Sequence, residues 1–178
     1  MADDTEETLF DQGLYFRFAN DESPNMTLQI NSEDDPEAGL IMKTFDDGGM
    51  SENWHLYFES GRYFIRNYLH GKDWQLSLSE TNTRFPLLRP RAKDLGQQWL
   101  IEEAGTSSKF KLVNELRGPD YVLSLSRDND VPTMDRAGDS AWDITVNTGV
   151  DPVPDDMMDD VEVVVCSALC KYPLLTFH

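Results

Sequence analysis

The sequence predicts an all-β protein with the β-trefoil fold, in which twelve short strands form three pseudo-threefold repeats. Short stretches of alternating apolar residues end at Asn20, Asn67 and Asn114, which are 47 residues apart each time. Three further short apolar stretches follow in the same order within every repeat, separated by turn-forming residues. The first 150 residues lack the i, i+3, i+4, i+7 apolar spacing of an amphipathic helix.

The first strand of each repeat is predicted to end at its asparagine. The residues four and two positions earlier are apolar, which is the period of a strand with one buried face: Phe16 and Phe18, Tyr63 and Ile65, Phe110 and Leu112. The second strand begins eight or nine residues after the asparagine and carries a second alternating pair: Leu28 and Ile30, Leu76 and Leu78, Leu123 and Leu125.

The third and fourth strands complete each repeat. The third is predicted in the stretches LIMKTF, PLLRPR and VPTMDR, and the fourth begins at Trp54, Trp99 and Trp142. In a β-trefoil, six strands close a barrel and six form hairpins over one end, so each repeat buries its apolar face only against the other two. We expect the three tryptophans to lie in this core. We expect the three asparagines to bond to the turn that follows them.

These residues resemble the ricin B-type β-trefoil family, especially its single-domain fungal-like lectins. The stretches YFIRNYLHGKDWQLSLS and KFKLVNELRGPDYVLSLS follow the family pattern, with Gly71 and Gly118 in register, and each repeat closes on its tryptophan. The resemblance covers about residues 13–147. It implies a binding module whose ligand is a carbohydrate.

The chain departs from the family at the positions that bind sugar. The resemblance implies an Asp as the acceptor for sugar hydroxyls, but the matching residues are Gln29, Ser77 and Ser124. A carboxylate accepts stronger, charge-assisted hydrogen bonds than a neutral hydroxyl. The glutamine of the closing Gln-x-Trp motif is present only at Gln97, since Glu52 and Ser140 replace it in the first and third repeats. The sequence thus predicts degenerate sugar sites.

Several residues are candidates for ligand contacts, and each also has a structural role as its alternative. Trp74 and Tyr121 precede the second strands of their repeats, where each is either an aromatic platform or part of the packing. Three acidic residues late in the second and third repeats are candidates for the missing acceptor or plain loop residues: Asp94, Asp135 and Asp139. The remaining candidates lie at family positions: Ser77, Gln97 and Ser124.

Charge and composition define the ends of the chain and exclude some partners. With 33 acidic and 15 basic residues the net charge is −18, which argues against nucleic acid and membrane surfaces as partners. We expect an acidic segment over 1–12, a β-trefoil domain over 13–150 with repeats at about 13–60, 61–107 and 108–148, and an acidic linker with an apolar tail over 151–178. The tail is predicted to add a strand, dock on the domain or pair with a second copy as a homodimer.

The function predicted is non-catalytic ligand binding. The sequence shows no nucleophile, metal or phosphate-loop motif, so no cofactor and no metal are expected. Cys166 and Cys170 are the only cysteines, and the acidic N-terminus is unlike a secretory signal, which favours the cytoplasm. Carbohydrate binding is the leading hypothesis. A protein-binding trefoil such as a protease inhibitor is the alternative, and an enzyme on this scaffold is the third.

Overall fold

A computed structural model describes residues 8–45, 49–105, 108–126, 130–138 and 140–158. The predicted tail beyond residue 158, with Cys166 and Cys170, and the candidate Asp139 lie outside these residues. Twelve strands and one short α-helix are present in the described part: β1 Tyr15–Asn20, β2 Met26–Ile30, β3 Leu40–Thr44, β4 Trp54–Glu59, β5 Arg62–Asn67, β6 Trp74–Ser79, β7 Asn82–Pro90, β8 Trp99–Glu103, β9 Lys109–Asn114, β10 Tyr121–Leu125, β11 Pro132–Arg136, β12 Trp142–Val146 and α1 Asp155–Met158. Three single-turn 3-10 helices lie between the strands, over Pro36–Ala38, Gly71–Asp73 and Leu95–Gln97. None of the helical segments in the described part is long and apolar enough to span a bilayer.

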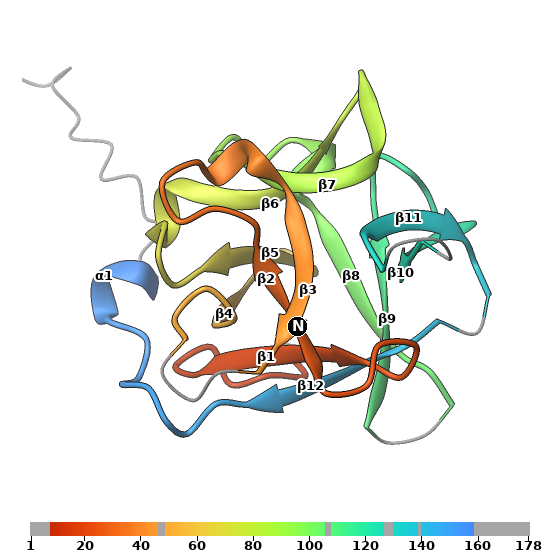
Figure 1. Cartoon of the computed structure of the whole chain (residues 1–178). Coiled ribbons are helices and arrows are strands. Elements are labelled where there is room, and N and C mark those ends of the chain that lie inside the picture. The colour runs from red at the N-terminus through yellow and green to blue at the C-terminus, as the bar shows by residue number, and fades with distance from the viewer. Residues whose placement is uncertain (1–7, 46–48, 106–107, 127–129, 139, 159–178) are drawn as a thin grey trace, which may run out of the picture.

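The strands form the predicted β-trefoil. Six of them pair in the order β12–β9–β8–β5–β4–β1, and β1 pairs back with β12 to close a barrel. The other six form three antiparallel hairpins, β2–β3, β6–β7 and β10–β11. Figure 1 shows the hairpins lying across one end of the barrel, as the threefold pattern predicts.

One tryptophan per repeat ties a barrel strand to the hairpin of the same repeat. The three indole rings, of Trp54, Trp99 and Trp142, are fully buried. Each indole N–H donates to the carbonyl of a hairpin leucine at 2.8–2.9 Å: Leu28, Leu76 and Leu123, respectively. The predicted core position of these residues is confirmed.

The asparagines that end the first strands are structural, as predicted. Their side-chain oxygens accept the amide of the residue two positions later, Glu22, Leu69 or Leu116, at 2.9–3.1 Å. Bonds of this kind hold a turn without help from the strand ladder. Gly71, four residues after Asn67, has φ +64°, a left-handed conformation that glycine adopts without steric cost.

Phe10 closes the end of the barrel opposite the hairpins, although it precedes the first repeat. Its ring lies 5.0–5.8 Å from three equivalent aromatic rings, those of Phe16, Tyr63 and Phe110. These contacts are edge-on or tilted, the geometry that aromatic pairs prefer. The predicted acidic segment over 1–12 therefore contributes one residue to the core.

The residues after the last repeat dock on the outside of the barrel. Val153 and Met157 are buried against Tyr15, and the Val153 amide donates to the Gly13 carbonyl at 2.9 Å. Arg66, fully buried on β5, donates to the Met157 carbonyl at 2.7 Å. We call residues 150–158 the C-terminal latch; it includes α1, at the left of Figure 1.

Truncating Phe10 should destabilise the fold strongly. Phe10→Ala removes a buried ring at a point where three repeats meet, and such changes cost about 3–5 kcal/mol. Urea unfolding followed by tryptophan fluorescence measures the effect. Leu9→Ala is the control, because Leu9 is 53% exposed. Equal losses in the two variants would contradict the role of Phe10 as the barrel plug.

Burial of Tyr15 beneath the latch should make the free energy of unfolding decrease at alkaline pH. Burial, together with Tyr68 and Asp156, raises the pKa of Tyr15 from 10.0 to about 12. The folded state thus favours the protonated phenol, so this contribution is complete below pH 10 and is lost as the pH rises through about 12. The free energy of unfolding should fall over that range, and less steeply in Tyr15→Phe. Tyrosinate absorbance and urea titrations at pH 9 and 11 measure both; identical pH slopes would refute the assignment.

Candidate functional site

The position two residues before each anchor tryptophan holds a different residue in each repeat. In the first, buried Glu52 forms an ion pair with Arg17 at 2.8 Å. In the second, buried Gln97 accepts the amides of Ala92 and Lys93. In the third, the shorter Ser140 accepts a hydrogen bond from Asn20 Nδ2 at 3.3 Å. Only the third repeat therefore has a small side chain here.

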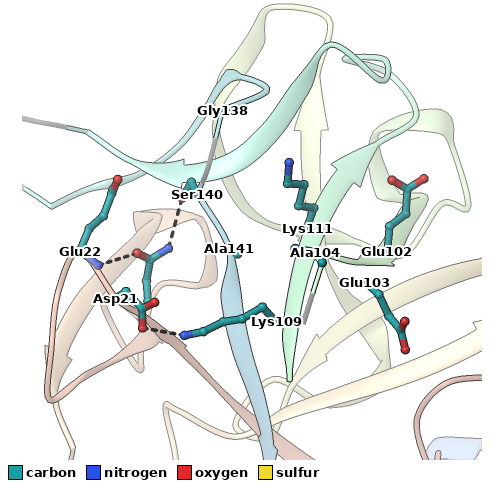
Figure 2. Close-up of a pocket in the computed structure, with 12 residues that line it drawn as sticks. Asp21, Glu22, Glu102, Glu103, Ala104, Lys109, Lys111, Gly138, Ser140 and Ala141 are labelled. Atoms are coloured by element: carbon teal, nitrogen blue, oxygen red, sulfur yellow. Dashed lines mark hydrogen bonds and ion pairs between the residues drawn. The ribbon is translucent and has the colours of Figure 1, made fainter. Parts of the chain in front are cut away.

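A cleft lies beside Ser140, where the third repeat meets the first. This junction cleft has a volume of about 1080 Å³. Its lining comes from the β1–β2 turn, the β8–β9 hairpin and the segment before β12: Asn20, Asp21, Glu22, Glu102, Glu103, Ala104, Gly105, Lys109, Lys111, Gly138, Ser140 and Ala141 (Figure 2). Asn67 and Asn114 donate to backbone carbonyls of the preceding repeat, those of Ser51 and Gly96, whereas Asn20 donates to a side chain at this cleft.

Lys109 crosses one end of the cleft as a clamp. Its Nζ lies 2.6 Å from carboxylate oxygens of both Asp21 in the first repeat and Asp143 in the third. Figure 2 shows the contact with Asp21. The hydrogen bonds to Asp143 and Asp21 raise the pKa of Lys109. An ammonium held in this way stays protonated, so Lys109 is unsuited to act as a general base.

Other charged groups of the cleft have no side-chain partner among the residues that the structure describes. These are the carboxylates of Glu22, Glu102 and Glu103 and the ammonium of Lys111. Lys111 and Glu102 face each other across the β8–β9 ladder without forming an ion pair. The cleft thus presents free acceptors and a free donor on the paired strands β8 and β9 and on the β1–β2 turn.

A smaller hollow continues the cleft and contains two predicted candidates. It measures about 130 Å³ and shares Glu22, Gly138 and Ser140 with the junction cleft. Ser124 and Asp135 line its other side. The fold therefore brings these two candidates together beside a cleft that the repeat pattern did not predict.

The second repeat has a separate cavity of about 370 Å³, which we call the second-repeat cavity. Its lining combines apolar residues with charged side chains: Leu78, Ser79, Glu80, Arg89, Asp94, Leu95, Gly96 and Leu116. The candidate Asp94 lines this cavity and is exposed. It therefore lies in a different hollow from the candidate Asp135.

The candidates at family positions are mostly turned into the protein. Ser77 is 1% exposed and its hydroxyl donates to the Leu78 carbonyl at 2.9 Å. Ser124 is also buried, with its hydroxyl 3.5 Å from the Leu125 carbonyl. Gln97 is fully engaged, because its amide nitrogen donates to the Pro90 carbonyl at 2.8 Å. The structure thus places the side chains of Ser77 and Gln97 inside the domain, where both bond to backbone carbonyls.

The aromatic candidates lie at the edge of the core. Trp74 and Tyr121 are half-buried and pack against the main apolar cluster. The Arg117 guanidinium lies 3.7 Å from the centre of the Tyr121 ring and covers one of its faces. Neither aromatic lines the junction cleft or the second-repeat cavity.

Comparison with solved structures supports the fold. The chain is similar to a part of a mosquitocidal holotoxin, with a TM-score of 0.67 and 18% identity over 82% of this chain, which spans only 19% of the toxin. It is also similar to the designed threefold-symmetric protein ThreeFoil, with a TM-score of 0.61 and 19% identity over 75% of this chain and 98% of that one.

A third neighbour is the β-trefoil lectin of the Vibrio vulnificus hemolysin/cytolysin with N-acetyl-D-lactosamine bound. Its TM-score is 0.57 at 14% identity, over 75% of this chain and 95% of the lectin. Identities this low establish the β-trefoil fold alone. No protein-family model matches the sequence, and the search of curated proteins found no match.

Most residues of the junction cleft were missed by the sequence reasoning. Glu22, Glu102 and Lys111 were not among the candidates, and they meet because barrel closure places β12 between β9 and β1. The one sequence feature that could have indicated the cleft is Ser140, which replaces the glutamine of the Gln-x-Trp motif. Within the described ranges, His, Cys, Asp and Glu form no group of three that could hold a metal ion.

Proposed function

We propose that this β-trefoil is a non-catalytic carbohydrate-binding protein and that the junction cleft is its binding site. The observation that carries the proposal is the set of free charged acceptors and donors on the rigid walls of one cleft. Sugar hydroxyls are donors and acceptors at close spacing, which carboxylates and ammonium groups bind through charge-assisted hydrogen bonds.

The rigidity of the walls supports this reading. Lys111, Glu102 and Glu103 stand on paired strands, and Glu22 follows the turn that the buried Asn20 fixes. A site that is held in place before binding loses little conformational entropy when the ligand enters. The candidates Ser124 and Asp135 extend the polar lining into the adjoining hollow.

The charge of the cleft favours a neutral glycan. Its lining holds four acidic side chains and two lysines, and the whole chain carries a net charge of −18. Sulfated, sialylated or uronic-acid glycans would meet a repulsive field on approach. We therefore expect neutral hexose or N-acetylhexosamine chains to bind in preference to anionic ones.

A glycan array that includes neutral and anionic members tests the proposal with the full chain. The strongest neutral hit then serves as the probe for isothermal titration with variants. Glu22→Gln should weaken binding about tenfold or more, since hydrogen bonds to charged groups contribute about 1.5–3 kcal/mol. Ser140→Gln should weaken it by filling the cleft.

The control is Glu33→Gln, an exposed loop residue that does not line the cleft. It makes the same change of charge as Glu22→Gln and should leave the affinity unchanged. An array without signal above background, or equal losses in the two variants, would refute carbohydrate binding in the junction cleft.

One observation favours protein binding as the second candidate function. The β6–β7 hairpin, at the top of Figure 1, carries Phe85, which is 42% exposed. Phe85 borders an apolar hollow of about 370 Å³ on the hairpin end of the barrel, beside Pro86, Leu87, Val131 and Pro132. An exposed aromatic residue next to a hollow is the kind of anchor that protein interfaces use.

Inhibition assays against cysteine, serine and aspartic proteases test this alternative. If the hairpin binds a protease, Phe85→Ser should raise the inhibition constant at least tenfold, because anchor residues of interfaces contribute about 2 kcal/mol or more. Val146→Ser, at another exposed apolar residue, is the control. Absence of inhibition at micromolar protein would rule out this candidate for the proteases assayed.

A further inference from the structure

A continuous buried hydrogen-bond chain runs from the C-terminal latch to the loop beside the second-repeat cavity. Arg66 Nη1 donates to the Met157 carbonyl at 2.7 Å. The Gln75 amide, oriented so that both its atoms are satisfied, accepts from Arg66 Nε and Nη2 at 3.2 Å. The Gln75 nitrogen then donates to Gln97 Oε1 at 2.9 Å.

Gln97 connects these hydrogen bonds to the backbone of the loop formed by residues 90–97. Its Oε1 accepts the amides of Ala92 and Lys93 at 2.8 and 3.2 Å, and its Nε2 donates to the Pro90 carbonyl at 2.8 Å. Asp94, Leu95 and Gly96 of the same loop line the second-repeat cavity. The shape of this wall therefore depends on where Gln97 is held.

The side chains that form these hydrogen bonds occur in the second repeat alone. Arg66 directly precedes the asparagine of its repeat, and the equivalent positions in the other two repeats hold Ala19 and Val113. Counting from the hairpin leucines, Thr27 and Val122 stand where the second repeat has Gln75. Burying Arg66, Gln75 and Gln97 costs desolvation that apolar residues avoid, so the scaffold does not require them.

The C-terminal latch supplies backbone acceptors at the outer end of this series of hydrogen bonds. Besides the bond from Arg66, the Lys72 ammonium donates to the Asp156 carbonyl at 2.5 Å. The Met157 sulfur lies 3.6 Å from the point where a Cβ on Gly71 would stand. Arg66 is itself placed over the Tyr57 ring, 4.2 Å from its centre. Undocking the latch takes away one acceptor of a fully buried guanidinium, which must then find another or shift.

We propose that Arg66, Gln75 and Gln97 are positioning residues that couple docking of the latch to the shape of the second-repeat cavity. With the latch docked, the loop over 90–97 is held in its present course and the cavity is formed. With the latch displaced, the loop is released and the cavity loses its Asp94–Gly96 wall. Access to this cavity is therefore regulated from the C-terminal end of the domain.

Amide hydrogen exchange tests this coupling in the full chain and needs no ligand, so its result is independent of the proposed carbohydrate site. The amides of Ala92 and Lys93 report on the bonds to Gln97, and the Val153 amide reports on the latch. The amide of buried Ser23 in the first repeat, which donates to the Asn20 carbonyl at 3.0 Å, is the internal reference.

Two kinds of variant should give the same signature. Met157→Asp, alone or with Val153→Asp, places charge in the apolar contact of the latch, and Arg66→Met breaks the chain while leaving that contact intact. Each should speed exchange at Ala92 and Lys93 at least tenfold while exchange at Ser23 changes less than twofold. Met50→Asp, the same change at an exposed methionine, should alter neither.

Three results would overturn the proposal. The first is loss of protection at Val153 with Ala92 and Lys93 still protected, which would mean that the latch moves without the loop. The second is unchanged exchange at Ala92 and Lys93 in a folded Arg66→Met. The third is a matching loss of protection at Ser23 in every variant, which would show general destabilisation instead of specific coupling.

Discussion

A hydrogen bond from a buried indole to a leucine carbonyl is the constraint on which the rest of the structure depends. Trp54, Trp99 and Trp142 each make it, and each joins a barrel strand to the hairpin of its own repeat. An N–H buried in an apolar core must be paired, so this bond fixes the distance between the two layers in all three repeats. Because three repeats share this frame, their differences are confined to positions that the frame leaves free.

The position two residues before the tryptophan shows what this freedom allows. Glu52 uses it for a buried ion pair, Gln97 for the support of a loop, and Ser140 leaves space that becomes the junction cleft. The same backbone geometry thus gives three different local environments. A site on this fold is therefore defined by where the three repeats differ, whereas their likeness defines the scaffold.

The repeat pattern was sufficient to predict the fold, because period-two alternation, turn residues and recurring tryptophans all agree on it. Phe10 was missed because it lies outside the repeats, and only barrel closure brings it to the axis. The site was less predictable for the same reason. Ser124 and Asp135 could be selected by position, whereas Glu22 and Lys111 become neighbours only through strand pairing distant in sequence.

The two hollowed regions differ in how freely their residues can change. Glu22, Glu102 and Lys111 stand on turns and outward strand faces, so ligand contacts in the junction cleft can change without disturbing the core. The second-repeat cavity depends on Arg66, Gln75 and Gln97, which are buried and bonded to one another. A change at any of them leaves a buried polar partner unsatisfied, so that cavity cannot be altered without a cost in stability. Buried polar chains of this kind suit a fixed link between two parts of a domain, whereas exposed charges suit recognition.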